Sequence, residues 1–376
     1  MNRLGLVLLA LSTVPLHALP TMIRLGYPTC VSCHISPQGG GLLNLYGRSI
    51  DQAQSLVGGE YTPWQNSVAE FLNDNGRITQ DSRSVLQQQD VSTDSKAGTQ
   101  VFRSRFLYRN STDLGKRWRF SATIMGENVP APRSSFAYES ATRSSQTFVT
   151  SALLSYRMKP ALEIEVGRDA LPTGVNMADL STFVRARNRE GYYDTASQAK
   201  VFWWAKRYQI TSYVFAPGGN ERTGQHESGG GVLTEMDVLG NRRTVVGMNL
   251  LRGTSALEDR TLIGPYARLG FGRWGILAEH DITDRSLKST KVSFLQSTSY
   301  GQLFIAAREW LVPSLVVERL RVQRPYQEHL DAVKLEVAAR ISSQFTITIG
   351  PRLQHDPISG HWSRGVVFQV AFKTVH

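Results

Sequence analysis

Long apolar runs are scarce in this sequence of 376 residues. After the first twenty positions, no stretch stays apolar for the roughly eighteen residues that a transmembrane helix needs, which argues against a helical membrane protein. Charged residues make up only 19% and glycines number 32, a composition that disfavours disorder and coiled coils. Two cysteines cannot build a disulfide-dense scaffold. A transmembrane β-barrel stays compatible, because such barrels are only mildly hydrophobic overall.

The first eighteen residues have the features of a secretory signal peptide. Arg3 precedes an apolar run from Leu4 to Leu11, and the small residue Ala18 marks the expected cleavage site. A membrane anchor is the weaker interpretation, because the run is too short to span a bilayer. Cleavage removes one positive charge, so the net charge of +11 becomes +10. Export, together with the lack of a recognition motif, makes nucleic acid an unexpected partner for this basic chain.

Both cysteines fall in one pentapeptide, Cys30-Val31-Ser32-Cys33-His34. Two thiols at this spacing can form thioethers to one haem, and the histidine that follows is placed to be the proximal iron ligand. We therefore expect one covalent haem c on Cys30 and Cys33, with His34 on the iron. A disulfide or redox pair and a zinc site are the alternatives. The first lacks a surrounding thioredoxin-like pattern, and the second is short of ligands.

The flanks of the pentapeptide supply further candidates. Three glycines at 39–41 let the backbone turn sharply or approach a macrocycle closely. Arg48 is a candidate partner for a haem propionate. Met22, the nearest in sequence, and Met125, on the polar face of an expected strand, are candidate sixth ligands. An iron without a sixth ligand would instead favour small-ligand binding or peroxidase-like chemistry.

From about residue 99 onward, polar and apolar residues alternate. Between Lys116 and Met125, apolar side chains at 118, 120, 122 and 124 share one face and polar ones at 117, 119, 121 and 123 share the other. Successive side chains of a strand point to opposite faces, so each such segment has one apolar and one polar face. Repeated many times, this pattern is typical of a transmembrane barrel. A soluble β-sandwich or propeller is the alternative, which alternation alone does not exclude.

Connector lengths favour the barrel. Short connectors at 111–115, 159–160 and 206–207 alternate with long ones at 127–144, 169–195 and 217–240, as expected for short periplasmic turns and long external loops. Fifteen segments are visible, whereas bacterial barrels use even numbers. We expect the missing strand at Ser84–Val91, giving sixteen strands, with fourteen as the alternative. The chain then divides into a signal peptide (1–18), a haem-binding head or plug (19–80), with a short helix at 63–73, and an all-β antiparallel barrel (81–376).

Arginines gather on the polar face of the first expected strands. These are Arg103, Arg105, Arg109, Arg117 and Arg119. If that face lines the lumen, it favours anionic groups such as haem propionates or anionic solutes. The alternative is that arginines line many porin lumens without such a role.

An exported head with one Cys-x-x-Cys-His motif, followed directly by a barrel, resembles the fused monohaem cytochrome–porins of the outer membrane. The motifs that carry the likeness are Cys30–His34 and Leu43-Asn44-Leu45-Tyr46-Gly47-Arg48. The resemblance implies a Gram-negative outer membrane, with its lipid around the barrel and the haem segment on the periplasmic side or inside the barrel. It also implies electron transfer between an external redox donor or acceptor, Fe(II) among them, and a periplasmic carrier such as a soluble cytochrome.

Such a protein is an electron-transfer protein rather than a turnover enzyme, although an iron-oxidase type of activity is compatible with it. The alternative function is an outer-membrane porin that passes small anionic solutes and whose head is a structural haem or plug. No catalytic triad, carboxylate pair or phosphate-binding loop stands out in the sequence.

Overall fold

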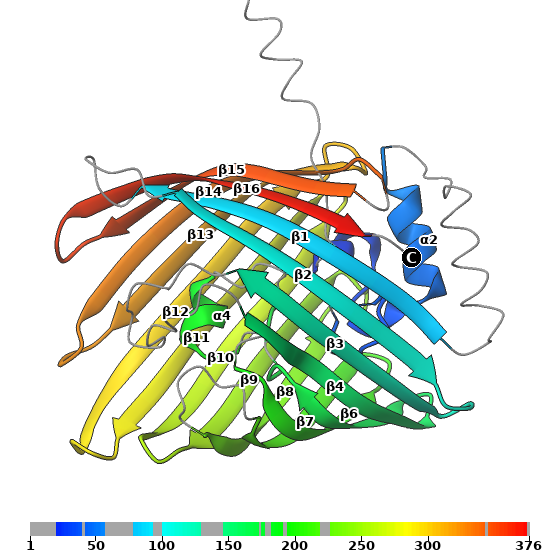
Figure 1. Ribbon diagram of the computed structural model, residues 1–376, viewed down its shortest axis with the longest axis horizontal. Helices are drawn as coiled ribbons and strands as arrows, with labels where there is room; N and C mark the ends of the chain where they lie inside the picture. The colour runs from blue at the N-terminus through cyan, green and yellow to red at the C-terminus, as the bar shows by residue number, and fades with distance from the viewer. Residues whose placement is uncertain are drawn as a thin grey trace, which may run out of the picture.

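Sixteen antiparallel strands close into a single barrel in the computed structural model (Figure 1). The structure describes residues 20–39, 42–56, 78–92, 100–128, 146–172, 174–176, 182–190, 194–218, 226–342 and 345–373. The strands are β1 (Ile78–Ser92), β2 (Gln100–Asp113), β3 (Trp118–Asn128), β4 (Gln146–Lys159), β5 (Leu162–Asp169), β6 (Ala196–Trp204), β7 (Tyr208–Pro217), β8 (Ser228–Asp237), β9 (Thr244–Thr254), β10 (Glu258–Phe271), β11 (Trp274–Leu287), β12 (Val292–Ile305), β13 (Leu311–Val322), β14 (Glu328–Arg340), β15 (Phe345–Asp356) and β16 (His361–Lys373). Each pairs with its sequence neighbours, and β1 pairs with β16, so the barrel has no free edge.

The alternation seen in the sequence becomes an apolar outer face. On β3, Trp118, Phe120 and Ile124 are exposed, whereas Ser121 and Thr123 line the interior. The pattern continues around the barrel, with Ile263, Ile282, Leu303 and Val317 among the exposed outer side chains. A soluble sandwich or propeller would bury such residues in its core, whereas a barrel that faces lipid places them outward. The predicted antiparallel barrel of sixteen strands is confirmed.

The strand count is right partly because two errors offset each other. The strand expected at Ser84–Val91 is present as the longer β1. The segment 217–240, expected to be one long loop, contains β8. Conversely, the two strands expected at 288–297 and 300–310 are the single strand β12. The glycines at 229–231, within the segment expected to be a loop, are strand residues that pair with β7 and β9. A side chain at Gly231 would be crowded, because its Cβ would lie only 2.4 Å from the hydroxyl of Tyr213.

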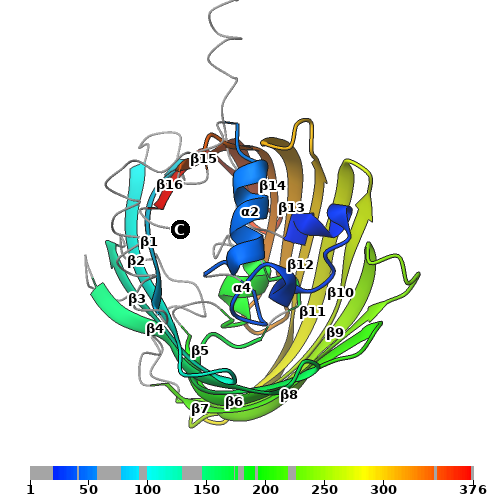
Figure 2. The same cartoon turned by 90° about the vertical axis from the view of Figure 1, so that its right-hand side faces the viewer.

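A small N-terminal unit lies at one end of the barrel. We call residues 20–39 and 42–56 the head; they contain the 3₁₀ turns η1 (Pro20–Leu25) and η2 (Cys30–Ser32) and the helix α2 (Leu45–Ala53). Figure 2 shows α2 lying across the barrel opening. We call this opening the head end; the connectors 114–117, 205–207, 238–243 and 306–310 belong to it. The expected signal peptide at 1–18 and the expected helix at 63–73 lie outside the described residues.

Several contacts fasten the head to the barrel. Arg24 of η1 forms an ion pair of 2.5 Å with Glu309, in the connector between β12 and β13. The amide of Leu56 donates to the carbonyl oxygen of Arg340, at 2.8 Å. Arg340 also pairs with Asp51 of α2. At Gly270 of β10, an added Cβ would lie 2.6 Å from the Cα of Arg24, so this glycine lets the head pack closely on the wall.

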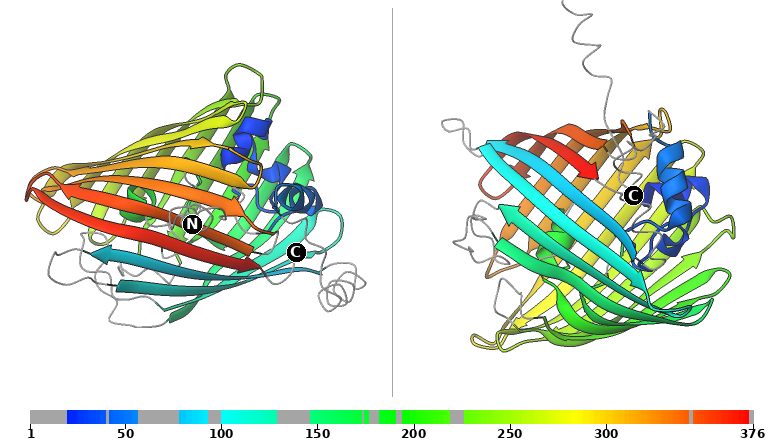
Figure 3. Two further views of the ribbon diagram at one scale, coloured as in Figure 1. Left: turned by 90° about the horizontal axis from the view of Figure 1, so that it is seen from above. Right: turned by 45° about the vertical axis from the view of Figure 1, so that its right-hand side comes forward.

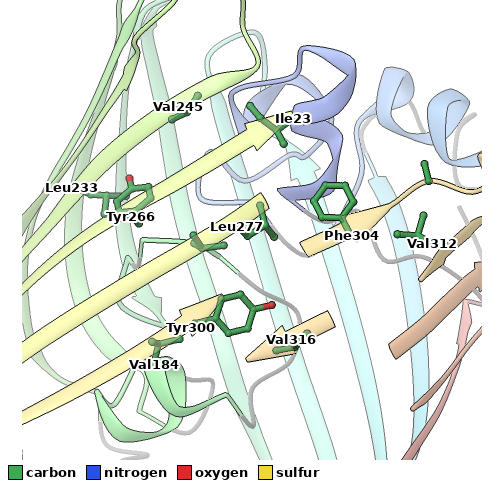
Figure 4. Close-up of a cluster of buried hydrophobic side chains, with 12 residues drawn as sticks. Ile23, Val184, Leu233, Val245, Tyr266, Leu277, Tyr300, Phe304, Val312 and Val316 are labelled. Carbon is green, nitrogen blue, oxygen red and sulfur yellow. The ribbon is translucent and has the colours of Figure 1, made fainter. Parts of the chain in front are cut away.

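The barrel interior behind the head is packed rather than open on the side of β8 to β13. The segment between β5 and β6 folds inward and carries the short helix α4 (Phe183–Arg187), as the two views of Figure 3 show. Ile23 of the head, Val184 of α4 and inner-face residues such as Tyr266, Leu277 and Phe304 belong to one buried apolar cluster (Figure 4). Among the described residues, no helix is long and apolar enough to cross a membrane.

Candidate functional site

The pentapeptide Cys30–His34 forms a tight, locally hydrogen-bonded loop. The amides of Cys33 and His34 both donate to the carbonyl oxygen of Cys30, at 3.1 and 2.9 Å. His34 then pairs with Leu43 in an isolated antiparallel bridge, which holds these two residues side by side. The two cysteines and the histidine therefore present their side chains from a single turn.

The residues after the pentapeptide hold this turn in place. Asn44 is the N-cap of α2, because its Oδ1 accepts from the amide of Gly47 at 2.8 Å. The Nδ2 of the same side chain donates to the carbonyl oxygens of Val31 and Ser32, both at 3.3 Å. Gly47 must lack a side chain, because a Cβ there would lie 2.1 Å from the carbonyl oxygen of Cys33. Asn44 and Gly47, both from the motif Leu43–Arg48, thus help to fix the conformation of the pentapeptide Cys30–His34.

Gly39 performs a similar role on the other side of the turn. Its φ of +80° lies in the left-handed region, and a Cβ on it would lie 2.8 Å from the Sγ of Cys30. The backbone carbonyl oxygen of the adjacent Gln38 accepts from the side-chain Nδ2 of Asn176, at 2.5 Å. Gln38 also accepts from Lys200 of β6, at 2.9 Å. The glycine-containing stretch therefore turns sharply beside Cys30 and is tied to the barrel interior.

One cavity, which we call the head cavity, brings these groups together. Its volume, counted together with the space open to solvent, is about 660 Å³. It is lined by Met22, Tyr27, Thr29, Cys30, Cys33, His34, Gly39, Leu43, Gly47, Ile50, Asp51, Gln54, Asn176, Arg268 and Arg340. Met22 of η1 therefore faces the same cavity as the cysteines and the histidine.

Two arginines of the barrel wall complete the head cavity, and neither was singled out from the sequence. Arg268 of β10 is 5% exposed and forms an ion pair of 2.6 Å with Glu235 of β8. Its Nε has no hydrogen-bond partner among the described residues. Arg340, at the end of β14, is 2% exposed and lies 3.2 Å from Asp51. The cavity thus combines an apolar side with two buried cations.

Burial also affects the thiols. It raises the pKa of Cys30, an effect that the nearby Arg268 partly opposes. It also raises the pKa of Cys33, and the neighbouring Cys30 adds to that increase. No disulfide joins Cys30 to Cys33. Among the residues that the structure describes, no group of three or more His, Cys, Asp or Glu is placed to hold a metal ion, so the zinc interpretation gains no ligands from the fold.

Other candidates from the sequence lie elsewhere. Arg48 is not among the described residues that line the head cavity, and its Nε donates to the carbonyl oxygen of Leu43 at 3.4 Å. Met125 is fully buried on β3 and does not line the described walls of the cavity either. Arg119 reaches the head, since its guanidinium donates to the carbonyl oxygen of Ile35 at 3.5 Å. Arg109 is buried, and Arg117 is exposed in a turn.

The interior is not uniformly basic, because acidic residues pair with its cations. Glu258 contacts both Arg189, beside α4, and Arg285 of β11, the latter at 2.8 Å. Arg260 of β10 pairs with Glu227 at 2.6 Å. Hence the excess of inward arginine expected from residues 103–119 does not extend to this wall. The side chains of Arg103 and Arg105 are outside the described set.

Several solved structures share the fold. OprB of Pseudomonas putida at high pH is 12% identical, covers 82% of this chain and 97% of its own length, and gives a TM-score of 0.59. OmpT of Vibrio cholerae is 7% identical, with 79% and 97% covered and a TM-score of 0.57. The anion-selective porin from Comamonas acidovorans is 12% identical, with 79% and 99% covered and a TM-score of 0.52. At these identities the likeness shows the fold alone, which is that of an outer-membrane porin barrel.

No protein-family model matches the sequence, and no curated protein matches it.

Proposed function

We propose that this chain is an outer-membrane barrel that carries one haem c in its head and passes electrons between an external donor or acceptor, Fe(II) among them, and a periplasmic carrier. One observation carries the proposal: Cys30, Cys33 and His34 line the same cavity, which Met22 and two buried arginines complete. When bound, haem c supplies a one-electron redox centre. The thioether, proximal-ligand and counter-charge groups that such a cofactor needs are therefore gathered in one place.

The membrane location is supported by three features. The outer face of the strands is apolar, the fold neighbours are outer-membrane barrels, and residues 1–18 have the sequence features expected of an export signal. We place the head end on the periplasmic side. It carries the shorter connectors, whereas the longer ones, at 129–145 and 170–195, belong to the opposite end. Both the start of β1 and the end of β16 also lie at the head end, since Arg83 pairs with Lys373.

Several residues of the head cavity have a proposed role. Cys30 and Cys33 hold the haem, His34 is the proximal ligand, and Met22 is the sixth ligand. Arg268 is a better partner for a propionate than Arg48, because it lines the cavity, is buried and has an Nε with no described partner. An anion beside Arg268 would satisfy that donor. Arg340 also lines the cavity, where it is paired with Asp51.

The second candidate function is a porin that passes small anionic solutes, with the head as a structural plug. The fold comparisons favour it, since the neighbours include a porin described as anion-selective. The packed cluster that joins Ile23 to α4 opposes free passage along the side of β8 to β13. The paired charges of Arg260 and Glu227 likewise leave less net positive charge to attract anions on that wall.

One comparison separates the two functions. Cells that express the chain with haem maturation machinery are monitored by absorption while ferrous iron is added outside. Electron transfer predicts growth of the reduced c-type band, which is absent in the Cys30→Ala/Cys33→Ala variant. The porin function predicts that both proteins conduct anions equally in planar bilayers and that external reductant leaves any haem unchanged.

A further inference from the structure

A second, larger concavity lies next to the head cavity, and we call it the rim groove. It is open, with a volume of about 1340 Å³. Tyr27 and Thr29 line both the groove and the head cavity, so these two residues form a shared wall. Val31 and Ser32, the middle residues of the Cys-x-x-Cys motif, also face the groove. A molecule bound in the rim groove would therefore be separated from the proposed redox centre only by shared side chains such as Tyr27 and Thr29.

Cations dominate the outer margin of the rim groove. Lys206 and Arg207 come from the turn between β6 and β7, and Arg242 from the turn between β8 and β9. All three are exposed, and among the described residues none of them has an ion-pair partner within 4.0 Å. Arg243 lies beside them, because its Nε is 4.0 Å from the Cβ position of Gly26.

The acidic residues of the groove do not cancel this charge. Glu235 is occupied by Arg268. Asp237 is buried and accepts the backbone amide of Arg242 at 2.9 Å. Arg157, a further cation of the groove, is neutralised by Glu163. The rim therefore has a net positive charge that neighbouring groups leave unbalanced.

Aromatic side chains surround the same groove. Tyr46 and Tyr208 are about half exposed, at 49% and 51%, and Tyr27 bonds to Tyr46 through its hydroxyl. Trp204 is held in place, since its Nε1 donates to Gln209 at 3.0 Å. Tyrosine, tryptophan and arginine are the residue types enriched at protein interfaces.

We infer that the rim groove is the docking surface for a soluble redox protein with an acidic surface. Opposite charge steers such a partner to the rim and orients it. Buried Gln209 and Val245 line part of the groove, so it extends to the inner face of the barrel, which favours a protein over a lipid headgroup. The inference rests on the proposed function, which supplies the electron to be passed.

The test measures binding and haem content separately on the full chain, purified with its haem in detergent. The immobilised protein is exposed to two soluble monohaem cytochromes, one acidic and one basic, at low and at physiological salt. We expect preferential binding of the acidic cytochrome, with an affinity that falls steeply with salt. Lys206→Glu/Arg207→Glu should weaken binding at least tenfold, and Lys206→Gln/Arg207→Gln should weaken it less.

The matched control is Lys288→Glu/Lys291→Glu, which changes the net charge equally at the opposite end of the barrel. It should bind like the unmodified protein. Circular dichroism establishes that each variant keeps its barrel. Equal binding of both cytochromes, equal effects of the two double reversals, or displacement of the cytochrome by vesicles of anionic phospholipid would overturn the inference. An unmodified chain that binds the acidic cytochrome but carries no covalent haem would support the docking surface while removing the proposed function.

Discussion

The guanidinium of Arg340 and the carboxylate of Asp51 lie 3.2 Å apart, and each side chain is only 2% exposed. The first belongs to the end of β14 and the second to α2, so this pair joins the head to the barrel wall. Arg340 also donates to the backbone carbonyl of Asp51, at 3.1 Å. Because Arg340 lines the head cavity as well, anchoring of the head and shaping of the site depend on the same side chain.

Removal of Arg340 should loosen the head before it affects the barrel. Arg340→Ala breaks the buried ion pair with Asp51, and breaking such a pair costs about 3–5 kcal/mol. Limited proteolysis should then release the head while the barrel resists. The control is Arg319→Ala, which breaks the exposed pair with Asp331 and should cost less than about 1 kcal/mol. Equal protease sensitivity of the two variants would contradict the anchoring role.

Gly39→Ala should reduce covalent haem attachment. The new Cβ would lie 2.8 Å from the Sγ of Cys30 and would occupy a left-handed backbone conformation. Gly115→Ala is the matched control, because Gly115 has a similar φ of +89° but nothing within 4 Å of its Cβ position. Haem staining after denaturing electrophoresis measures the result. The two variants separate strain from steric blocking, and equal haem yields would argue against close packing at Cys30.

Met22→Ala should lower the haem midpoint potential and alter its spin state, since methionine ligation raises the potential of c-type haems. Met158→Ala is the control, because Met158 is 42% exposed on β4 and lies far along the chain from the motif. Potentiometric titration of both purified variants gives the comparison. An unchanged potential and spectrum in Met22→Ala would show that the sixth ligand is another group.

The haem-free chain should lose head stability at alkaline pH. Burial raises the pKa of Cys30 and of Cys33 above the ordinary 9.0. The folded thiols keep their protons where the unfolded thiols have released them, so stability present at neutral pH is lost as pH rises from about 9 through the higher folded values. Alkylation by iodoacetamide should show a midpoint above 9.0 in the folded chain. A midpoint at or below the ordinary value would contradict the burial.

The barrel was predictable because its signal is local and repeated. Alternation around Trp118, Phe120 and Ile124 reports which residues face outward, without knowledge of the partner strands. The same local logic failed at β8, where three glycines resemble a loop. They pair with β7 and β9, and they are glycines because the neighbouring backbone leaves no room for side chains. A Cβ at Gly229 would lie 2.0 Å from the carbonyl oxygen of Arg252.

The candidate site was predictable only in part, for a related reason. Cys30, Cys33 and His34 lie within five consecutive positions, so their spacing alone predicts the cofactor. Arg268 and Arg340 reach the cavity through the closure and stagger of the barrel, which bring together residues more than two hundred positions apart. Arg48 was the natural candidate from sequence proximity, but its Nε donates to the carbonyl oxygen of Leu43, and it is not among the described residues that line the head cavity. Only the folded barrel identifies the arginines of the wall.

The most direct test of the central claim is the intact mass of the protein from an outer-membrane fraction, measured for the unmodified chain and for Cys30→Ala/Cys33→Ala. Both are produced with haem maturation machinery and analysed after denaturation. The account predicts one haem covalently retained by the unmodified chain and none by the variant, with both chains in the same membrane fraction. An unmodified chain without added mass, or with its two thiols joined in a disulfide, would contradict it.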